Sequence, residues 1–554
     1  MKKLLLITVL LLCTISLTNT QWVSNYGVSS GDVNFTNAKG TAITCDAAGN
    51  SYVTGYSYEN ESQNDIITIK YTPAGDTAWV RSFNGDANLN DEGNGICVDN
   101  AGNVYVVGFA EYNGKSKDVV IIKYSSNGTE QWSRAYSGAD MPTIDEGLGI
   151  VVDASGYIYI TGYTTFTDNY TDILVRKYDP SGDLVWSASE DGSSNLNAQG
   201  LAIAVGRTGN VYVTGFVTVS GANTDIALFK YNSDGQLQWA KTINGNGSTE
   251  DKAWGIVVDE SDNIFITGYV TESANNTDAF TAKYHCSGTM MWSKTYNGTG
   301  NQSDKAWGIV VDTDGSVYVS GESTADAGNI NYLTVKYTAT GTQSWVSEYN
   351  GTGNGEDRAS AVSILLNSSN TKSVIVTGKS WGPSNTFDYA TVRYNTESGI
   401  QSQVNRYTFT GNSNDIAKDL VISPSKKVII TGFSQLIIDA GVGSSYVSTQ
   451  SVEFGETIEM NSELTTPGSF ILHQNYPNPF NPATSIRFDL TQSSNVRLAV
   501  YDMLGREINV LVNQNLTAGT HNITFNASNL SSGVYFYKLE AGSFRDIKKM
   551  TLVK

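Results

Sequence analysis

The chain has 554 residues and a formal net charge of −19, from 54 acidic and 35 basic side chains. This acidic excess argues against a nucleic-acid partner, because phosphate recognition needs clustered Lys and Arg. Gly (54) and Tyr (31) are abundant, Pro (9) is scarce, and no segment has sustained helical periodicity. The composition therefore predicts an all-β protein with many short strands and tight turns.

The N-terminus has the form of a secretory signal peptide. A basic start precedes an apolar run over residues 4–12, which is too short to span a bilayer. We expect residues 1–20 to be the signal peptide. Cys13 would suggest a lipoprotein, but Leu12 precedes it where a small residue is expected. No later segment is apolar enough to predict a transmembrane helix.

A repeat of 53 or 54 residues dominates the chain up to about residue 450. Its clearest mark is one tryptophan per copy, at Trp79, Trp132, Trp186, Trp239, Trp292 and Trp345. Each copy has four short runs rich in Val, Ile and Tyr, bounded by turn residues, as in 255–259, 263–269, 278–284 and 292–296. Four strands in about 53 residues match one blade of a β-propeller.

The number of blades follows from the second strand of the repeat, which occurs eight times. The last copy lacks a fourth strand and has a weak third strand around residues 446–451. The segment at Trp22 is a fourth strand with no partners before it. Because ring closure protects sheet edges, we predict an eight-bladed propeller over residues 21–455, closed by this N-terminal strand. Seven blades is the alternative, if the chain after Ser434 forms no blade.

The repeat unit can be written G-I-x-V-D-x-x-G-N-x-Y-V-T-G-Y, followed by D-x-x-x-x-K-Y and a Trp. It resembles the SBBP repeat of bacterial β-propeller proteins over about residues 22–450. The resemblance implies the propeller architecture and says almost nothing about activity. The seventh and eighth copies depart from the pattern, because they lack both the Trp and the V-D pair.

The end of the chain differs from the repeat in charge and in pattern. From residue 470 onward there are eight Lys and Arg against five Asp and Glu, whereas most of the acidity lies upstream. We therefore predict a linker at residues 456–470 and a separate domain at residues 471–554. About seven short alternating runs, punctuated by glycine, predict an Ig-like β-sandwich.

Five motifs follow one another along this domain. They are Asn475-Tyr-Pro-Asn-Pro-Phe480, Val500-Tyr-Asp-Met-Leu-Gly505, Ala518-Gly519, Leu530-Ser-Ser-Gly533-Val-Tyr535 and Lys548-Lys-Met-Thr-Leu-Val-Lys554. Together they closely resemble the type A C-terminal sorting domain of the type IX secretion system. The resemblance implies passage through the periplasm and the type IX machinery as partner. The protein would then be released or held at the outer-membrane surface. It also implies a sorting signal at Lys548, Lys549 and Lys554.

Strand order predicts which face of the ring could bind a ligand. The first-to-second and third-to-fourth connections are tight turns on one face. The other connections, such as residues 57–64 and 85–94, are longer and more varied. Binding residues concentrate in such loops on a rigid scaffold. We therefore place any ligand site on this long-loop face.

One acidic position recurs on that face, just before the first strand of the repeat, at Asp91, Asp145, Asp251, Asp304, Asp357 and Asp415. If the first strand lines the channel, these carboxylates would form a ring able to hold Ca²⁺ or to meet sugar hydroxyls. The interpretation we favour is turn chemistry with pairing to Lys252, Lys305 and Arg358. We therefore expect no resident cofactor, with Ca²⁺ as the weaker alternative.

Two further charged sets recur at the tight-turn face. Aspartates end the first strand at Asp46, Asp99, Asp153, Asp259 and Asp312, and lysines end the third strand at Lys70, Lys123, Lys177, Lys230, Lys283 and Lys336. Since both sets lie on one face, we expect them to pair with each other in a structural role.

No segment has the form of an active site. The chain has three histidines, His285, His473 and His521, and lacks the metalloprotease, nucleophile-elbow and P-loop motifs. We expect an exported, non-catalytic propeller that binds a glycan, a peptide or a neighbouring surface protein. A polysaccharide-acting hydrolase or lyase stays open, because a carboxylate pair needs no histidine. A structural or adhesive surface component is the third hypothesis.

Overall fold

The computed structural model describes residues 20–27, 37–58, 63–112, 117–138, 144–166, 170–191, 196–220, 223–247, 249–273, 276–325, 329–367, 370–410, 413–438, 441–454, 470–475, 478, 480–490, 494–516, 519–542 and 544–553. Three predictions therefore fall wholly or almost wholly outside the described residues. They are the signal peptide at residues 1–20, the linker at residues 456–470 and the sorting residue Lys554.

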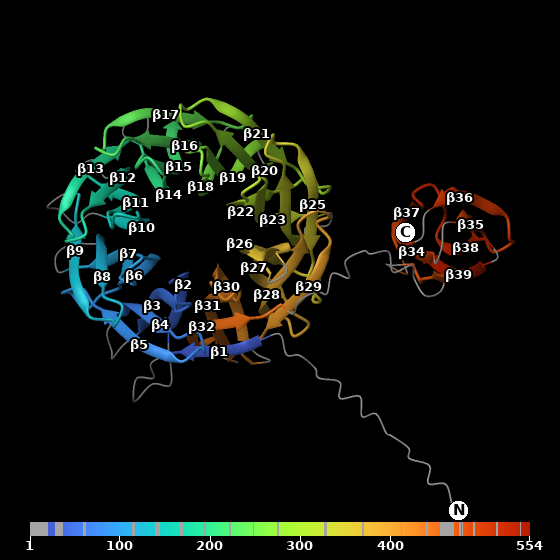
Figure 1. The fold of residues 1–554 in the computed structure, drawn as a ribbon, viewed down its shortest axis with the longest axis horizontal. Helices are drawn as coiled ribbons and strands as arrows, with labels where there is room; N and C mark the ends of the chain where they lie inside the picture. Colours follow the sequence, from blue (N-terminus) through green and yellow to red (C-terminus); the bar gives the residue numbers. More distant parts are fainter. Residues whose placement is uncertain are drawn as a thin grey trace, which may run out of the picture. The chain divides into compact units, whose positions relative to one another are not determined.

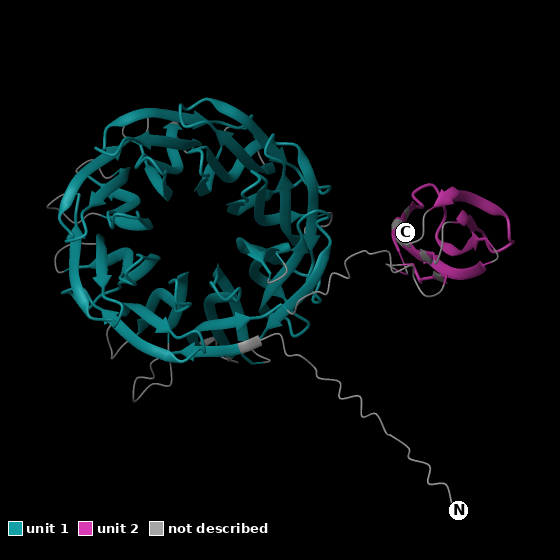
Figure 2. Cartoon of the chain, in the orientation of Figure 1, with its two compact units in different colours: residues 1–455 teal, residues 456–554 magenta. Residues whose placement is uncertain are grey.

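The chain divides into two compact units, Met1–Gly455 and Glu456–Lys554 (Figure 2). The protein is all-β: the described residues form strands and turns and contain no helix. Consequently, within that part of the chain, no helix has the length and apolarity that a membrane span requires.

The first unit contains eight four-stranded antiparallel sheets that follow one another around a ring (Figure 1). Seven of them consist of four consecutive strands. The first three are β2 (Ala38–Cys45), β3 (Ser51–Tyr58), β4 (Asn64–Tyr71), β5 (Thr77–Phe83); β6 (Glu92–Val98), β7 (Val104–Glu111), β8 (Lys117–Tyr124), β9 (Glu130–Tyr136); and β10 (Glu146–Val152), β11 (Ile158–Thr165), β12 (Thr171–Tyr178), β13 (Leu184–Glu190).

The next four sheets repeat this order. They are β14 (Ala198–Val205), β15 (Val211–Ser220), β16 (Asn223–Tyr231), β17 (Leu237–Ile243); β18 (Lys252–Val258), β19 (Ile264–Ser273), β20 (Asn276–Tyr284), β21 (Met290–Tyr296); β22 (Asp304–Val311), β23 (Val317–Thr324), β24 (Ile330–Tyr337), β25 (Gln343–Tyr349); and β26 (Asp357–Leu366), β27 (Lys372–Trp381), β28 (Phe387–Asn395), β29 (Gln401–Tyr407). In every sheet the first strand lies nearest the axis of the ring and the fourth lies outside (Figure 1).

The eighth sheet joins the two ends of the unit. It contains β30 (Ser413–Ile422), β31 (Val428–Ile438) and β32 (Gly441–Val452), with β1 (Thr20–Tyr26) as its fourth strand. β1 pairs antiparallel with β32, from Thr20 opposite Val452 to Tyr26 opposite Val447. The third strand that the sequence placed around residues 446–451 is therefore longer than expected, and the Trp22 segment is its partner.

One contact recurs between neighbouring sheets at the outside of the ring. A fourth-strand tryptophan lies against a glycine in the next sheet's third-to-fourth turn, where an added Cβ would meet the indole. The pairs are Trp22–Gly75, Trp79–Gly128, Trp132–Gly182, Trp186–Gly235, Trp239–Gly288, Trp292–Gly341 and Trp345–Gly399. These glycines also have positive φ, which side chains disfavour. Trp22 of the eighth sheet thus contacts the first sheet in the same way as the tryptophans of six other sheets contact the sheet that follows them.

The hydrophobic core of the ring lies between the sheets, because each sheet buries both of its faces. Ile226 and Leu228 of β16, for example, pack with Ile256, Ile264 and Ile266 of the following sheet. These contacts use the Val, Ile and Tyr positions that marked the strands in the sequence. The turns and loops lie at the two ends of each sheet.

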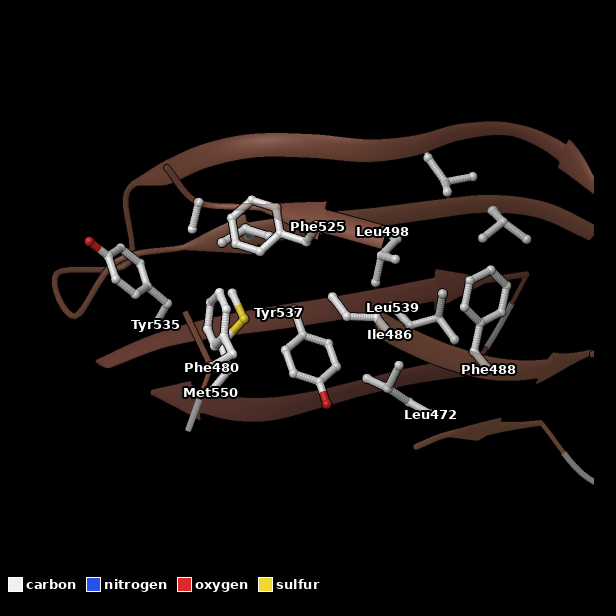
Figure 3. Close-up of a cluster of buried hydrophobic side chains, with 14 of the residues drawn as sticks. Leu472, Phe480, Ile486, Phe488, Leu498, Phe525, Tyr535, Tyr537, Leu539 and Met550 are labelled. Carbon is white, nitrogen blue, oxygen red and sulfur yellow. The ribbon is translucent and has the colours of Figure 1, made fainter. Parts of the chain in front are cut away.

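The second unit has two sheets around one core (Figure 3). One contains β33 (Ile471–Leu472), β34 (Ala483–Leu490) and β37 (Gly519–Asn526); the other contains β36 (Glu507–Leu516), β35 (Ser494–Tyr501), β38 (Gly533–Ala541) and β39 (Phe544–Leu552). Phe488, Leu498, Tyr537 and Met550 are fully buried between them. The final strand is therefore part of the core, through Met550 and Leu552.

Candidate functional site

A β-bulge at the same place in every first strand shapes the inner rim of the ring. In each of the eight sheets one residue of the first strand has no partner in the second strand. These bulged residues are Thr41, Asn94, Leu148, Leu201, Trp254, Trp307, Ser360 and Lys418. Bulges bend a strand and re-aim its side chains. Because the first strands are innermost, we call these eight residues and the residues two places before them the inner rim.

The bulge explains the glycine that recurs in every second strand. An added Cβ on Gly268 would overlap the carbonyl oxygen of Lys252, and the same holds for Gly321 with the oxygen of Lys305. The bulge pushes this carbonyl into the space that a side chain would occupy. The repeated glycine is therefore a requirement of the bulge in the neighbouring strand.

Three bulged side chains are polar and bind the next first strand around the ring. Their hydrogen bonds run from Thr41 Oγ1 to Gly93 O (2.5 Å), from Asn94 Nδ2 to Gly147 O (3.0 Å) and from Ser360 Oγ to Ala417 O (2.9 Å). The fourth polar member, Lys418, is exposed. These four belong to neighbouring sheets, because the eighth sheet lies beside the first.

The other four sheets, which are consecutive, carry apolar side chains at the bulge: Leu148, Leu201, Trp254 and Trp307. Trp254 is 40% exposed, and its indole lies edge-on to that of Trp307, with 5.5 Å between ring centroids. Neither indole belongs to the buried clusters between the sheets. An exposed indole on an innermost strand adds little to the core, so its chemistry is available to a ligand.

Charge also varies around the inner rim. The residues two places before the bulge are Lys39, Glu92, Glu146, Gln199, Lys252, Lys305, Arg358 and Ile416. Three consecutive sheets therefore present Lys252, Lys305 and Arg358. Carboxylates accompany these cations, because Lys252 pairs with Glu250 and Arg358 with Glu322 and Glu356. This sector therefore presents cations beside acidic side chains, and Lys305 has no ion pair within 4.0 Å among the described residues.

An acidic sector lies in the second and third sheets. Burial, and then the charge of Glu146, raises the pKa of Glu92 above its ordinary value. Glu146 accepts hydrogen bonds from Tyr163 Oη at 2.6 Å and from Asn94 Nδ2 at 3.0 Å. Lys117 Nζ lies 3.8 Å from Glu146 Oε2. The rim thus combines two carboxylates in one sector with cations and indoles in another.

The six predicted aspartates lie at the long-loop end of the first strands, but their side chains are buried. Each is at most 1% exposed. Asp91 Oδ2 accepts the Gly85 N–H at 2.7 Å, and its Oδ1 accepts the Glu111 N–H at 2.8 Å. We call this pair of hydrogen bonds, from two backbone N–H groups to one carboxylate, the clasp. It recurs at Asp145, Asp251, Asp304 and Asp357, while Asp415 accepts from Phe409 N and Ser413 Oγ.

Each clasp links the loop between the fourth strand of one sheet and the first strand of the next to the end of a second strand. These carboxylates therefore bind backbone N–H groups of loops, in line with the structural role that we favoured. The pairing that we expected with the following cations is replaced by other contacts. Lys252 bonds Glu250 at 3.2 Å, and Arg358 lies 3.2 Å from Glu322. Among the described residues, no group of three His, Cys, Asp or Glu side chains is placed to hold a metal ion. Ligand binding by the six aspartates stays a prediction.

Burial has an electrostatic cost at these positions. It raises the pKa of Asp91 to about 6, although the two backbone N–H donors act in the opposite direction. Burial likewise raises the pKa of Asp251, Asp304, Asp357 and Asp415. Each clasp therefore keeps a carboxylate ionised in a place where water would solvate it better.

At the tight-turn end, the aspartates do not pair with the third-strand lysines as expected; among the described residues, one member of the aspartate set, Asp312, has a lysine partner, Lys372 of the next sheet, at 2.6 Å. The Asp46 carboxylate accepts from the N–H groups of Ala48 and Asn50 and from Tyr52 Oη. Lysines of the third strand instead reach carbonyl oxygens of the next sheet, as Lys70 Nζ does with Ser126 O at 2.9 Å. The turn donors lie closer to the aspartate than any lysine of the set, which explains the outcome.

Three pockets stand out in the described residues, and two lie between tight turns. One, of about 300 Å³, is lined by the turns at residues 258–261 and 311–315; another, of about 260 Å³, includes the equivalent turns at Asp99 and Asp153. They are two copies of one repeated gap. The third lies in the second unit, beside Met503 and Ile547. The two pockets of the first unit therefore lie at its tight-turn end, away from the inner rim.

Residues 474–553 match the family model described as the secretion system C-terminal sorting domain. The motifs at Asn475 and Lys548 lie inside the match. The protein is therefore secreted through the type IX system to the cell surface or the extracellular space.

Similarity elsewhere is limited. The regulatory protein FlaEY of Caulobacter vibrioides is 26% identical over 184 residues, which cover 27% of this chain and 19% of that protein. The chain thus spans about a fifth of that relative's length.

Two solved structures resemble the chain weakly. PorZ, a surface component of the type IX secretion system of Porphyromonas gingivalis, shares 11% identity, with 93% of this chain and 81% of that chain covered and a TM-score of 0.33. The quinohemoprotein alcohol dehydrogenase of Comamonas testosteroni shares 10% identity, with 82% and 78% covered and a TM-score of 0.43. At these values neither likeness assigns an activity.

Sequence reasoning missed most of the inner rim. Trp254 and Trp307 are 53 residues apart but stand outside the tryptophan series that marks the repeat. This second tryptophan position, present in only two copies of the repeat, was the available signal. The bulge was not predictable from alternation, because an unpaired residue shifts every later residue to the opposite face.

Proposed function

We propose that the secreted protein is a non-catalytic binding module whose ligand contacts the inner rim at the long-loop end of the first unit. One observation carries this proposal: the turns, clasps and tryptophan contacts repeat from sheet to sheet, whereas the inner rim changes in nearly every sheet. Repeated positions maintain a scaffold, and positions released from the repeat are free to serve recognition.

We further propose that the eight sheets are the blades of one eight-bladed β-propeller, with β1 completing the eighth blade. The β1–β32 pairing and the Trp22–Gly75 contact support this interpretation. The propeller would occupy residues 21–455 and the sorting domain residues 471–554, with residues 456–470 as linker. The division of the chain at Gly455 supports the same boundary.

The binding proposal is tested with the purified protein on arrays of polysaccharides and peptides, together with an assay for released reducing sugar. We expect retention of a glycan without sugar release. Release of sugar by the protein, lost in a matched inactive variant, would refute the non-catalytic assignment. Absence of any binding would favour a structural or adhesive surface component.

A hydrolase is the second candidate, and the acidic sector favours it specifically. Glu92 and Glu146 are non-repeating acids in adjacent sheets, and the pKa of Glu92 is raised, as a general acid requires. If this candidate is right, Glu92→Gln removes sugar release and keeps binding. If no release is detected in the parent protein on any bound glycan, the acidic sector serves binding alone.

The sorting proposal concerns Lys548 and Lys549. Deleting residues 548–554 would also remove Met550 and Leu552 from the core, so failed export would then report unfolding. Lys549 is exposed, and Lys548 is partly exposed, 4.0 Å from Asp546. The double substitution Lys548→Gln and Lys549→Gln therefore tests the signal itself. We expect the variant to accumulate in the periplasm, whereas Lys294→Gln, on the outermost strand of a propeller sheet, exports normally.

A further inference from the structure

Two adjacent sheets share an identical segment at the inner rim. Residues 251–255 and residues 304–308 both read Asp-Lys-Ala-Trp-Gly, and none of the other six sheets has this sequence at the equivalent place. Each segment contributes one clasp aspartate, one lysine and one bulged tryptophan. The first strands β18 and β22 belong to neighbouring sheets of the ring (Figure 1). The ring contact between Trp254 and Trp307 shows that the two segments are adjacent.

The two segments hold the same backbone geometry. Ala253 and Gly255 flank the bulge in β18, as Ala306 and Gly308 do in β22. Each clasp aspartate anchors its segment through backbone N–H groups. The side chains at the rim are therefore carried by a rigid frame, so little conformational entropy is lost when they bind.

The indoles provide an apolar surface for a ring-shaped ligand. Trp254 is 40% exposed, and Trp307 braces it edge-on at 5.5 Å between centroids. Trp307 is in turn held edge-on by Tyr269, at 6.1 Å. Rigid aromatic side chains of this kind often carry most of a binding energy. The C–H face of a pyranose fits such a surface.

Lys252 and Lys305 provide positive charge in the same two segments. Lys305 Nζ lies 4.6 Å from the centre of the Tyr269 ring, and no described carboxylate lies within 4.0 Å of it. Lys252 pairs with Glu250 at 3.2 Å; the lysine side chain is 18% exposed and the glutamate side chain 57% exposed, so a ligand carboxylate would have to compete with Glu250 for this cation. Arg358 in the next sheet is already engaged by Glu322 and Glu356. The two lysines are therefore the cations that a ligand carboxylate can recruit.

We propose that the two Asp-Lys-Ala-Trp-Gly segments form adjacent subsites for consecutive acidic sugar units of a polysaccharide. In each subsite the tryptophan contacts the apolar face of a sugar ring and the lysine pairs with its carboxylate. A duplicated subsite fits a ligand that is itself repetitive. This inference rests on the proposed binding function and names its ligand class.

The test uses the full-length protein and isothermal titration with polygalacturonate and its methyl ester, in which each carboxylate is replaced by an uncharged methyl ester group. Polygalacturonate binds and the methyl ester binds more weakly, by about tenfold. Trp254→Ala and Trp307→Ala each reduce polygalacturonate affinity about tenfold or more, whereas Trp254→Phe retains most of it. Lys252→Gln with Lys305→Gln removes the preference for the acidic polymer.

Two substitutions on β21, the outermost strand of the sheet that contains β18, serve as matched controls. Met291→Ala removes an apolar side chain that is 53% exposed, and Lys294→Gln removes an exposed cation. Neither changes affinity for polygalacturonate. The midpoint of urea unfolding, measured for every variant, establishes that the ring is intact.

The remaining outcomes separate this inference from the proposed function. Glycan binding that survives all four rim substitutions, or no preference for the acidic polymer, overturns the subsites while the binding function stands. Binding of poly-glutamate in place of polygalacturonate, with loss in the same variants, identifies an acidic peptide and overturns the saccharide. Failure to bind any array member overturns both.

Discussion

The two ends of the eight sheets of the first unit differ. At the tight-turn end, among the described residues, the tryptophan–glycine contact recurs in seven copies, the lysine–carbonyl contact in five and the aspartate turn in four. At the long-loop end, the clasp recurs, but the rim beside it changes from Thr41 and Asn94 to Trp254 and Trp307. The comparison teaches that, within a single strand, some positions keep the same structural contact from copy to copy, whereas the positions at the bulge differ in charge and size.

The Trp22–Gly75 contact between the eighth and first sheets gives the largest expected effect on stability. Trp22→Ala should lower the free energy of unfolding by about 3 kcal/mol, because it removes a packed indole from the junction between the eighth and first sheets. Urea unfolding followed by tryptophan fluorescence measures the change. Val23→Ala, on the same strand and 39% exposed in the parent, should cost less than about 1 kcal/mol. Equal effects of the two substitutions would contradict a closing role for Trp22.

The second-largest expected effect on stability concerns the β-bulge of the first strand. Gly268→Ala should lower the free energy of unfolding by about 2 kcal/mol, since its Cβ would collide with the carbonyl oxygen of Lys252. It should also weaken glycan binding, because it displaces the Lys252–Trp254 segment. Gly533→Ala is the control: the nearest atom is 4.0 Å from an added Cβ. A stable Gly268→Ala protein with unchanged binding would mean that the bulge does not position the rim.

The clasp should show a slightly smaller cost. Asp91→Asn should lower the free energy of unfolding by about 1.5 kcal/mol, because the amide cannot accept from both the Gly85 and Glu111 N–H groups. Exposed Asp76→Asn removes the same charge without a clasp and should be neutral within about 0.5 kcal/mol. Thermal unfolding of the three proteins at pH 7 measures the difference. If both variants lose equally, charge alone explains the effect.

The smallest expected effect is a pH dependence of the clasps. The pKa of Asp91 is raised to about 6, above the value near 4 of an unfolded chain, so the folded state binds more protons between these values. Stability should therefore rise by about 1 kcal/mol as pH falls from 7 to 5, and be lost again as pH rises through 6. The gain should shrink in Asp91→Asn. Stability that falls steadily between pH 7 and 5 would show that other groups control this range.

The sorting domain could be predicted further than the ligand site. Its signature residues are close together in sequence, and alternation such as Ile486, Phe488 and Leu490 names the core positions directly. The inner rim is different, because its residues are about 53 positions apart and meet only when the sheets are placed around one axis. Residues such as Glu92 and Glu146 have no local pattern that marks them as neighbours.

The sequence by itself determined the repeat, the four strands of each copy and the export address, because these depend on spacing, alternation and local turn chemistry. Tertiary structure decided what the repeated charges do. It buried the aspartates against backbone donors and directed the third-strand lysines to carbonyl oxygens. It also turned Trp254 and Trp307 toward the inner rim. The physical reason is that pairing across strands and sheets sets which face each side chain takes, and one unpaired residue per first strand is enough to change it.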